Sequence, residues 1–125
     1  MMKAVVTQGL HQPLRVASLP DPEPGPGEVV LKVARCGICG SDLHMTEDAA
    51  YGIKAGEVLG HEFAGEVVAL GAGVTGIASG DRVAAIPLMG CGRCPSCLAG
   101  EPAWCAEFAL QGGGYAEYVR TRASQ

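Results

Sequence analysis

Four of the six cysteines lie close together in the sequence, at Cys91, Cys94, Cys97 and Cys105. Two residues separate neighbouring cysteines in the first three, so tight turns at Gly92 and Pro95 can present their sulfurs to one ion. The longer gap before Cys105 lets the chain loop back and deliver the fourth sulfur. Structural zinc sites take four tetrahedral ligands, and thiolates suit them. The spacing therefore predicts a closed structural zinc site in a cysteine lobe of residues 90–106.

Two disulfides or four free thiols are the alternatives for these cysteines. The choice between metal binding and disulfides depends on the compartment of the protein. Residues 1–6 are followed at once by Thr7, Gln8 and Gly9, which leaves no signal-peptide hydrophobic region. No apolar run approaches the roughly 20 residues of a membrane span. We therefore expect a cytoplasmic, reducing setting without membrane contact, which favours metal binding over disulfides.

A second set of chemically capable residues is Cys39, His61 and Glu62. Each would be weak evidence alone, because a single cysteine or histidine is usually structural. Together they offer a thiolate, an imidazole and a carboxylate, the mixed set that a catalytic zinc uses. Cys36 forms another Cys-x-x-Cys with Cys39, so a redox pair stands as an alternative to a buried apolar role for Cys36.

Short strands must position these residues. Alternation and turn residues predict strands or extended segments at 3–7, 28–35, 62–70, 82–87 and 115–120. Residues 19–27 are too rich in proline for a helix or central strand. A short helix, capped by Ser41 or Asp42, is expected to run to about Asp48. Many short strands with little helix indicate a mainly β fold, a partly open β-barrel with short helices.

Composition limits the remaining choices. The chain has 125 residues, the size of one domain, and only 5% are aromatic, so its core must rest on aliphatic residues. A net charge of −4 without a basic stripe argues against a nucleic-acid partner. No strand–GxGxxG–helix unit for a dinucleotide is present, because residues 112–114 precede strand-like alternation.

These motifs resemble, in order and spacing, the catalytic domain of the zinc-containing medium-chain alcohol dehydrogenases, also described as GroES-like. The matching pieces cover nearly the whole chain from Met2, at residues 37–44, 60–74, 80–83, 91–105 and 113–119. The resemblance implies that the chain is a GroES-like catalytic domain over residues 1–125. It also implies two zinc ions, one catalytic and one structural.

The resemblance assigns roles residue by residue. Cys39 and His61 match two ligands of the catalytic zinc, and Glu62 matches an acid at or beside the metal. Asp42 matches a carboxylate that orients the ligating histidine. The four cysteines of the lobe match the structural-zinc ligands with no change of spacing.

The implied reaction is Lewis-acid catalysis of alcohol oxidation. Zinc would bind the alcohol oxygen and lower its pKa. Ser41 matches the hydroxyl that bonds the substrate oxygen, and His44 matches the outer end of the proton relay. Hydride would pass to NAD or NADP, giving an aldehyde or ketone. Gly40, next to Cys39, favours a polyol or secondary-alcohol subfamily.

Two parts of the family pattern lie outside these residues: a further zinc ligand and the Rossmann domain that binds the nicotinamide. We therefore expect a fragment or isolated domain that binds structural zinc well, catalytic zinc poorly, and is inactive alone. Its partner would be a small alcohol or carbonyl compound, and association of identical chains is left open. The alternatives are a stand-alone zinc-binding module with a binding or scaffolding role, and a zinc-free quinone-reductase-like relative, which the ligand set argues against.

Overall fold

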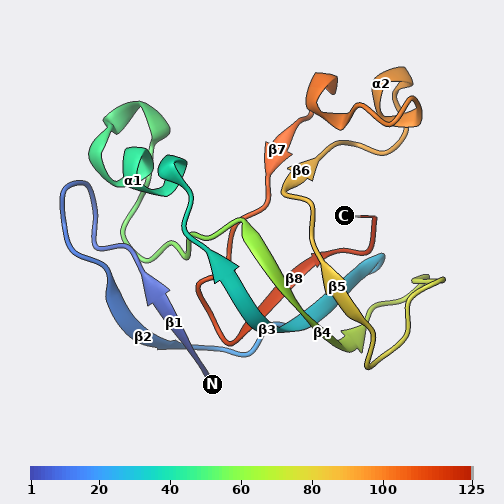
Figure 1. Ribbon diagram of the computed structural model, residues 1–125, viewed down its shortest axis with the longest axis horizontal. Helices are drawn as coiled ribbons and strands as arrows, with labels where there is room; N and C mark the ends of the chain where they lie inside the picture. The colour runs from blue at the N-terminus through green and yellow to red at the C-terminus, as the bar shows by residue number, and fades with distance from the viewer. Residues whose placement is uncertain (125) are drawn as a thin grey trace.

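The computed structural model describes residues 1–124, so Gln125, the last residue of the predicted domain, lies outside the described part. Its centre is a four-stranded antiparallel sheet with the order β5-β4-β3-β8 (Figure 1). The strands are β3 (Glu28–Gly37), β4 (Glu62–Leu70), β5 (Arg82–Ala84) and β8 (Tyr118–Arg122). This sheet holds the core, and the end of β3 and the start of β4 carry the candidate ligands Cys39, His61 and Glu62.

The core follows from the alternation of apolar residues along these strands. In β4, Phe63, Gly65 and Val67 are buried while Glu62, Glu66 and Val68 are exposed. The buried cluster joins β3, β4 and β8, and consists of Val29, Leu31, Phe63, Val67 and Val119. The core is therefore largely aliphatic, as the low aromatic content predicts, with Phe63 as its one aromatic member.

Two smaller sheets flank the central one. Strand β1 (Met2–Val6) pairs with β2 (Arg15–Leu19), and β6 (Leu88–Met89) pairs with β7 (Ala109–Leu110). Single bridges, Ala4 to Ala116 and Val6 to Val58, attach β1 to the rest of the molecule. Figure 1 shows β6 and β7 as the two stems that lead into the cysteine lobe.

Helical structure is short and confined to the connections. Helix α1 (Gly40–Glu47) and the 3-10 turn η1 (Ala49–Tyr51) follow β3. Within the cysteine lobe lie α2 (Pro95–Leu98) and η2 (Pro102–Trp104). None of the helices in residues 1–124 is long and apolar enough to cross a membrane.

The mainly β fold is confirmed, and over this range the strands form separate sheets with no closed barrel.

Several element boundaries differ from the sequence predictions. Strand β2 was not predicted. Strand β5 ends at Ala84, not at residue 87, and β8 begins at Tyr118 because Ala116 bridges to Ala4 outside the main ladder. The predicted cap of α1 was also wrong: Cys39 occupies that position, and Asp42 reaches back to accept a hydrogen bond from the Cys39 amide at 2.9 Å.

Candidate metal centres

The mixed cluster of Cys39, His61 and Glu62 is assembled by the pairing of β3 with β4. In the antiparallel register Gly37 lies opposite Glu62, so the end of β3 meets the start of β4. Cys39 follows Gly37 by two residues, and His61 directly precedes β4. One candidate ligand atom from each of the three residues lies within 4.8 Å of the others. The structure therefore brings together the residues that sequence analysis grouped.

His61 presents its two ring nitrogens to different neighbours. Its Nε2 atom lies 3.5 Å from Ser41 Oγ and 4.0 Å from Glu62 Oε1, on the side of the candidate ligands. Its Nδ1 atom lies 3.7 Å from Asp42 Oδ1. The His61 side chain is 12% exposed and that of Asp42 only 6%, whereas Glu62 is half exposed at 51%. The imidazole is thus held between a polar cluster and a buried carboxylate.

Asp42 is anchored through one oxygen only. Its Oδ2 atom accepts hydrogen bonds from the Cys39 amide at 2.9 Å and from the Tyr115 hydroxyl at 2.7 Å. Its Oδ1 atom is buried and has no hydrogen-bond partner among the described residues. A buried carboxylate oxygen without a donor is costly. The Nδ1 atom of His61 lies 3.7 Å from this oxygen.

The donor set and this unpaired oxygen fit a zinc ion. If Nε2 of His61 binds metal, the neutral ring carries its proton on Nδ1. After a small adjustment of the ring, this Nδ1–H group can donate a hydrogen bond to Asp42 Oδ1. That arrangement would satisfy the one buried side-chain oxygen left without a partner in residues 1–124. Cys39 and Glu62 would complete three protein ligands and leave room for a further ligand.

The two residues expected to move protons are placed differently. Ser41 lies on the first turn of α1 and its hydroxyl reaches His61. His44, three residues further along the helix, is exposed, and within residues 1–124 no side-chain hydrogen bond links it to Ser41. Ser41 therefore belongs to the cluster geometrically, while His44 is an exposed residue of the same helix.

Tyr115 is the residue that sequence analysis missed. It is not among the predicted site residues, yet its hydroxyl contacts Asp42 from 73 positions away in the sequence. Burial, followed by the hydrogen bond to the Asp42 carboxylate, raises the pKa of the Tyr115 hydroxyl above its usual range. The only available sequence signal was the position of Tyr115 in the last resemblance segment, which carries no information about its partner.

Gly60 and Gly114 make room for the side chains behind the cluster. A Cβ on Gly60 would lie 2.8 Å from Tyr115 Cδ1 and 2.9 Å from Cys36 Sγ, and Gly60 has a φ of +91°. A Cβ on Gly114 would lie 2.8 Å from the same sulfur. Burial is the main cause that raises the pKa of the Cys36 thiol. Cys36 is a free, partly buried cysteine whose sulfur lies close to these two glycines.

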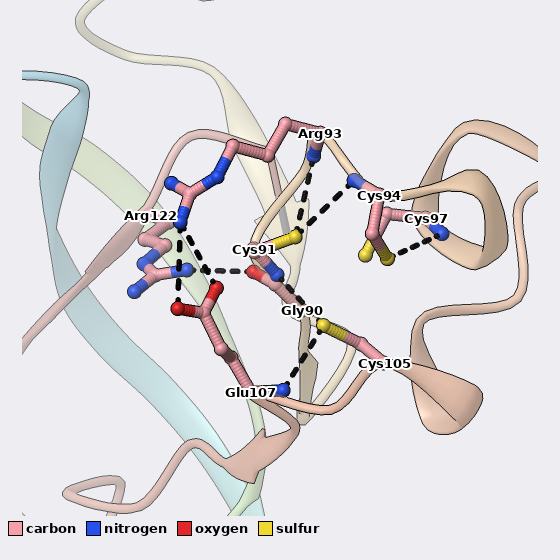
Figure 2. Close-up of polar contacts among 8 residues, drawn as sticks. All are labelled: Gly90, Cys91, Arg93, Cys94, Cys97, Cys105, Glu107 and Arg122. Carbon is pink, nitrogen blue, oxygen red and sulfur yellow. Dashed lines mark hydrogen bonds and ion pairs between the residues drawn. The ribbon is translucent and has the colours of Figure 1, made fainter.

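The four cysteines of the lobe form the second cluster. The sulfurs of Cys91, Cys94, Cys97 and Cys105 lie within 4.8 Å of one another. Figure 2 shows them converging from the loop after β6, the start of α2 and the segment after η2. All four are free cysteines, so the alternative of two disulfides is not present among them. A Cβ on Gly90 would overlap Cys97 Sγ, which explains a glycine at this position.

Backbone amides surround these sulfurs and favour negative charge on them. The amides of Arg93 and Cys94 point to Cys91 Sγ at 3.5 and 3.3 Å, and those of Cys91 and Glu107 to Cys105 Sγ at 3.4 and 3.3 Å. The amides on Cys91 lower the pKa of its thiol to about 7. At Cys97 the Gly92 amide favours the thiolate, but burial and neighbouring sulfurs raise the pKa to about 11. A divalent cation would relieve this crowding of thiolates.

The lobe is attached to the sheet by few contacts. Arg122 on β8 donates a hydrogen bond to the Gly90 carbonyl at 2.8 Å, and Arg93 pairs with Glu107 at 3.3 Å within the lobe (Figure 2). A cleft of about 960 Å³ separates the lobe from the loops at the end of the sheet. Trp104 is 79% exposed, so it adds little buried apolar surface to the lobe. The lobe therefore has little apolar core of its own.

A smaller cavity adjoins the mixed cluster. It measures about 310 Å³, and its lining includes His61, Asp42, Met45, Gly60, Leu110 and Gln111. The cavity meets His61 and Asp42, whereas Cys39, Ser41 and Glu62 do not line it.

Comparison with known proteins places the chain in the family that its sequence resembles. Residues 25–125 match the model of the alcohol dehydrogenase GroES-like domain. L-threonine 3-dehydrogenase of Streptomyces coelicolor is 43% identical over 130 aligned positions, which cover 98% of this chain and 38% of the relative. The match over most of the chain shows that it belongs to the alcohol dehydrogenase GroES-like domain family.

Solved structures agree in fold. A structure described as a short-chain alcohol dehydrogenase from Escherichia coli CFT073, complexed with NADH, has a TM-score of 0.85 and 38% identity over 98% of this chain and 36% of that one. A thermostable alcohol dehydrogenase from Pyrobaculum aerophilum, with cobalt and zinc bound, has a TM-score of 0.85 and 33% identity over 98% and 39%. The chain thus spans well under half the length of these relatives.

Proposed function

We propose that this chain is the catalytic domain of a zinc-dependent oxidoreductase that oxidises an alcohol to a ketone or aldehyde with NAD or NADP. The observation that carries the proposal is the convergence of Cys39, His61 and Glu62 within 4.8 Å, beside the Ser41 hydroxyl. Family membership favours this function over a stand-alone zinc-binding module. The nicotinamide would bind to a part of the enzyme outside these residues.

Each residue has a role in this proposal. Cys39, His61 and Glu62 would hold the zinc, which as a Lewis acid acidifies the alcohol hydroxyl. Asp42 orients His61 through the Nδ1 side of the ring. Ser41 would accept the alcohol proton, and exposed His44 would exchange a proton with solvent. Because no direct hydrogen bond joins Ser41 to His44 within residues 1–124, the relay between them requires a water or the substrate.

The substrate class follows from the relatives. A relative named L-threonine 3-dehydrogenase acts, by its name, at a carbon that carries a secondary hydroxyl. We propose a small secondary alcohol or polyol for this chain. One similar structure was solved with NADH, which supports a nicotinamide as hydride acceptor.

The four cysteines of the lobe would bind a structural zinc. Four thiolates close the coordination shell and leave no position for substrate, so this ion would only stabilise the lobe. A cytoplasmic location agrees with the free state of these cysteines. Self-association of the chain through exposed apolar residues such as Leu98 and Trp104 stays a prediction.

Zinc stoichiometry tests the proposal. The purified chain should take up two zinc ions, the second more weakly because the mixed cluster provides three protein ligands. His61→Ala should remove only the weaker ion, and Cys94→Ser only the tighter one. A wild-type chain that takes up a single ion, lost in Cys94→Ser and kept in His61→Ala, would reject the catalytic site and favour the zinc-binding module.

A further inference from the structure

Tyr115 has a fixed backbone beside the mixed cluster. Its amide donates to the Leu59 carbonyl at 3.0 Å, and its carbonyl accepts from the Val5 amide at 2.8 Å. The residue is therefore held between β1 and the segment that leads into His61. Its hydroxyl points to Asp42 Oδ2 at 2.7 Å and lies 3.4 Å from the Gly37 carbonyl.

This contact decides how Asp42 is oriented. With Oδ2 occupied by the Tyr115 hydroxyl and the Cys39 amide, the carboxylate turns its remaining oxygen, Oδ1, toward His61. The two donors come from different places, one from the cap of α1 and one from the strand region before β8. Both donors act on the same oxygen, so loss of the Tyr115 hydroxyl would leave the Cys39 amide as the one donor that holds Oδ2 among the described residues.

We propose that Tyr115 is a positioning residue of the mixed metal centre: its hydroxyl holds Asp42 so that Oδ1 faces His61 and fixes the imidazole for metal binding. The inference rests on the proposed zinc site of Cys39, His61 and Glu62. A phenol suits the task because it is a neutral donor, and its raised pKa keeps it protonated beside the carboxylate.

Cobalt titration of the zinc-loaded chain tests the proposal. Zinc first fills the four-cysteine site, and Co²⁺ then reports the mixed site through its visible absorption, which depends on ligand geometry. Tyr115→Phe removes only the hydroxyl and should weaken Co²⁺ binding about tenfold, the lower end of the range for groups behind metal ligands. Tyr118→Phe, the same change on β8 away from Asp42, should bind Co²⁺ like the wild type.

A double-mutant cycle separates positioning from packing. Asp42→Asn should weaken Co²⁺ binding by itself, and adding Tyr115→Phe should then have little further effect, since the hydroxyl acts through Asp42. Additive losses would overturn the proposal, because they would mean that Tyr115 acts by another route. Occupancy of the four-cysteine site, together with circular dichroism, checks that each variant is folded.

The outcomes distinguish this inference from the function on which it rests. Equal Co²⁺ affinity in Tyr115→Phe and wild type, with both binding a second ion, would reject the positioning role and leave the proposed zinc site intact. Failure of the wild type to bind any second ion would reject both. A tenfold loss confined to the mixed site, and absent in the Asp42→Asn background, is the result we expect.

Discussion

At the residue scale, Gly60 links backbone conformation to the geometry of the mixed cluster. It directly precedes His61 and lies against the side chains of Tyr115 and Cys36. Its φ of +91° is one that residues with a Cβ rarely adopt. Both the path of the chain into His61 and the space for Tyr115 therefore depend on the absence of a side chain here.

Gly60→Ala is expected to destabilise the chain by about 2–4 kcal/mol, because backbone strain adds to overpacking. Urea denaturation measures the change. Gly73→Ala is the matched control, since Gly73 also has a positive φ of +78° but open space around its Cβ position. It should cost only the strain of about 1 kcal/mol. Equal losses at the two glycines would show that the contacts with Tyr115 and Cys36 are unimportant.

At the element scale, β4 joins the core to the site, because it holds Phe63 and Val67 in the core and begins at Glu62. Two neighbouring valines on this strand face opposite ways: Val67 is fully buried and Val68 is 40% exposed. The same change, valine to alanine, can therefore be made on each face of β4 to measure how much the buried face contributes to stability.

Val67→Ala should lower the free energy of unfolding by about 2 kcal/mol, from lost apolar burial and the cavity that remains. Val68→Ala should change it by no more than about 0.5 kcal/mol. Thermal or urea unfolding with the four-cysteine site kept loaded measures both. Similar losses at the two positions would contradict the observed facing of β4.

The cysteine lobe is an element whose order should depend on metal. The buried cluster lies entirely on β3, β4 and β8, and the lobe contributes none of its members. A chelator strong enough to remove zinc should therefore raise amide hydrogen exchange across residues 90–106 while β3 and β4 stay protected. Uniform protection in the metal-free chain would show that the lobe is stable without the ion.

These elements also show what sequence could and could not reveal. Strand β4 was predictable because Phe63, Gly65 and Val67 alternate with more exposed residues. Strand β3 was predictable from its run of apolar residues, although Val30 is buried together with Val29 and Leu31. Strand β2 was missed because it lies between Pro13 and Pro20 and is largely exposed, which leaves no alternation to recognise.

The candidate site also contains residues that the sequence could reveal and residues that it could not. Local spacing identified the four cysteines, and the family motif identified Cys39 and His61. The contact of Tyr115 with Asp42 depends on how β1 and the segment before β8 come together, a long-range effect that no local pattern contains. The cap of α1 was misplaced because Ser41 and Asp42 are both strong cap formers, whereas Asp42 acts from the third helical position.

At the scale of the whole molecule, the proposed catalytic centre is only partly supplied by this chain. The mixed cluster offers three ligands, and the sequence contains no dinucleotide-binding fingerprint. We expect the isolated 125-residue chain to show no NAD- or NADP-dependent alcohol oxidation, even with both metal sites loaded. Absorbance of the reduced nicotinamide at saturating alcohol measures it. Sustained turnover by the pure chain would contradict the prediction.

The pairing of β6 with β7 has a consequence for how this domain could change over evolution. Leu88 lies opposite Leu110 and Met89 opposite Ala109, so the chain leaves and re-enters the body of the molecule at neighbouring points. The intervening segment can therefore be lengthened, shortened or exchanged for a simple hairpin without altering the path of the strands that carry Cys39 and His61. With a metal of its own, this segment would be a self-contained insertion, able to vary without disturbing the site at the end of the main sheet.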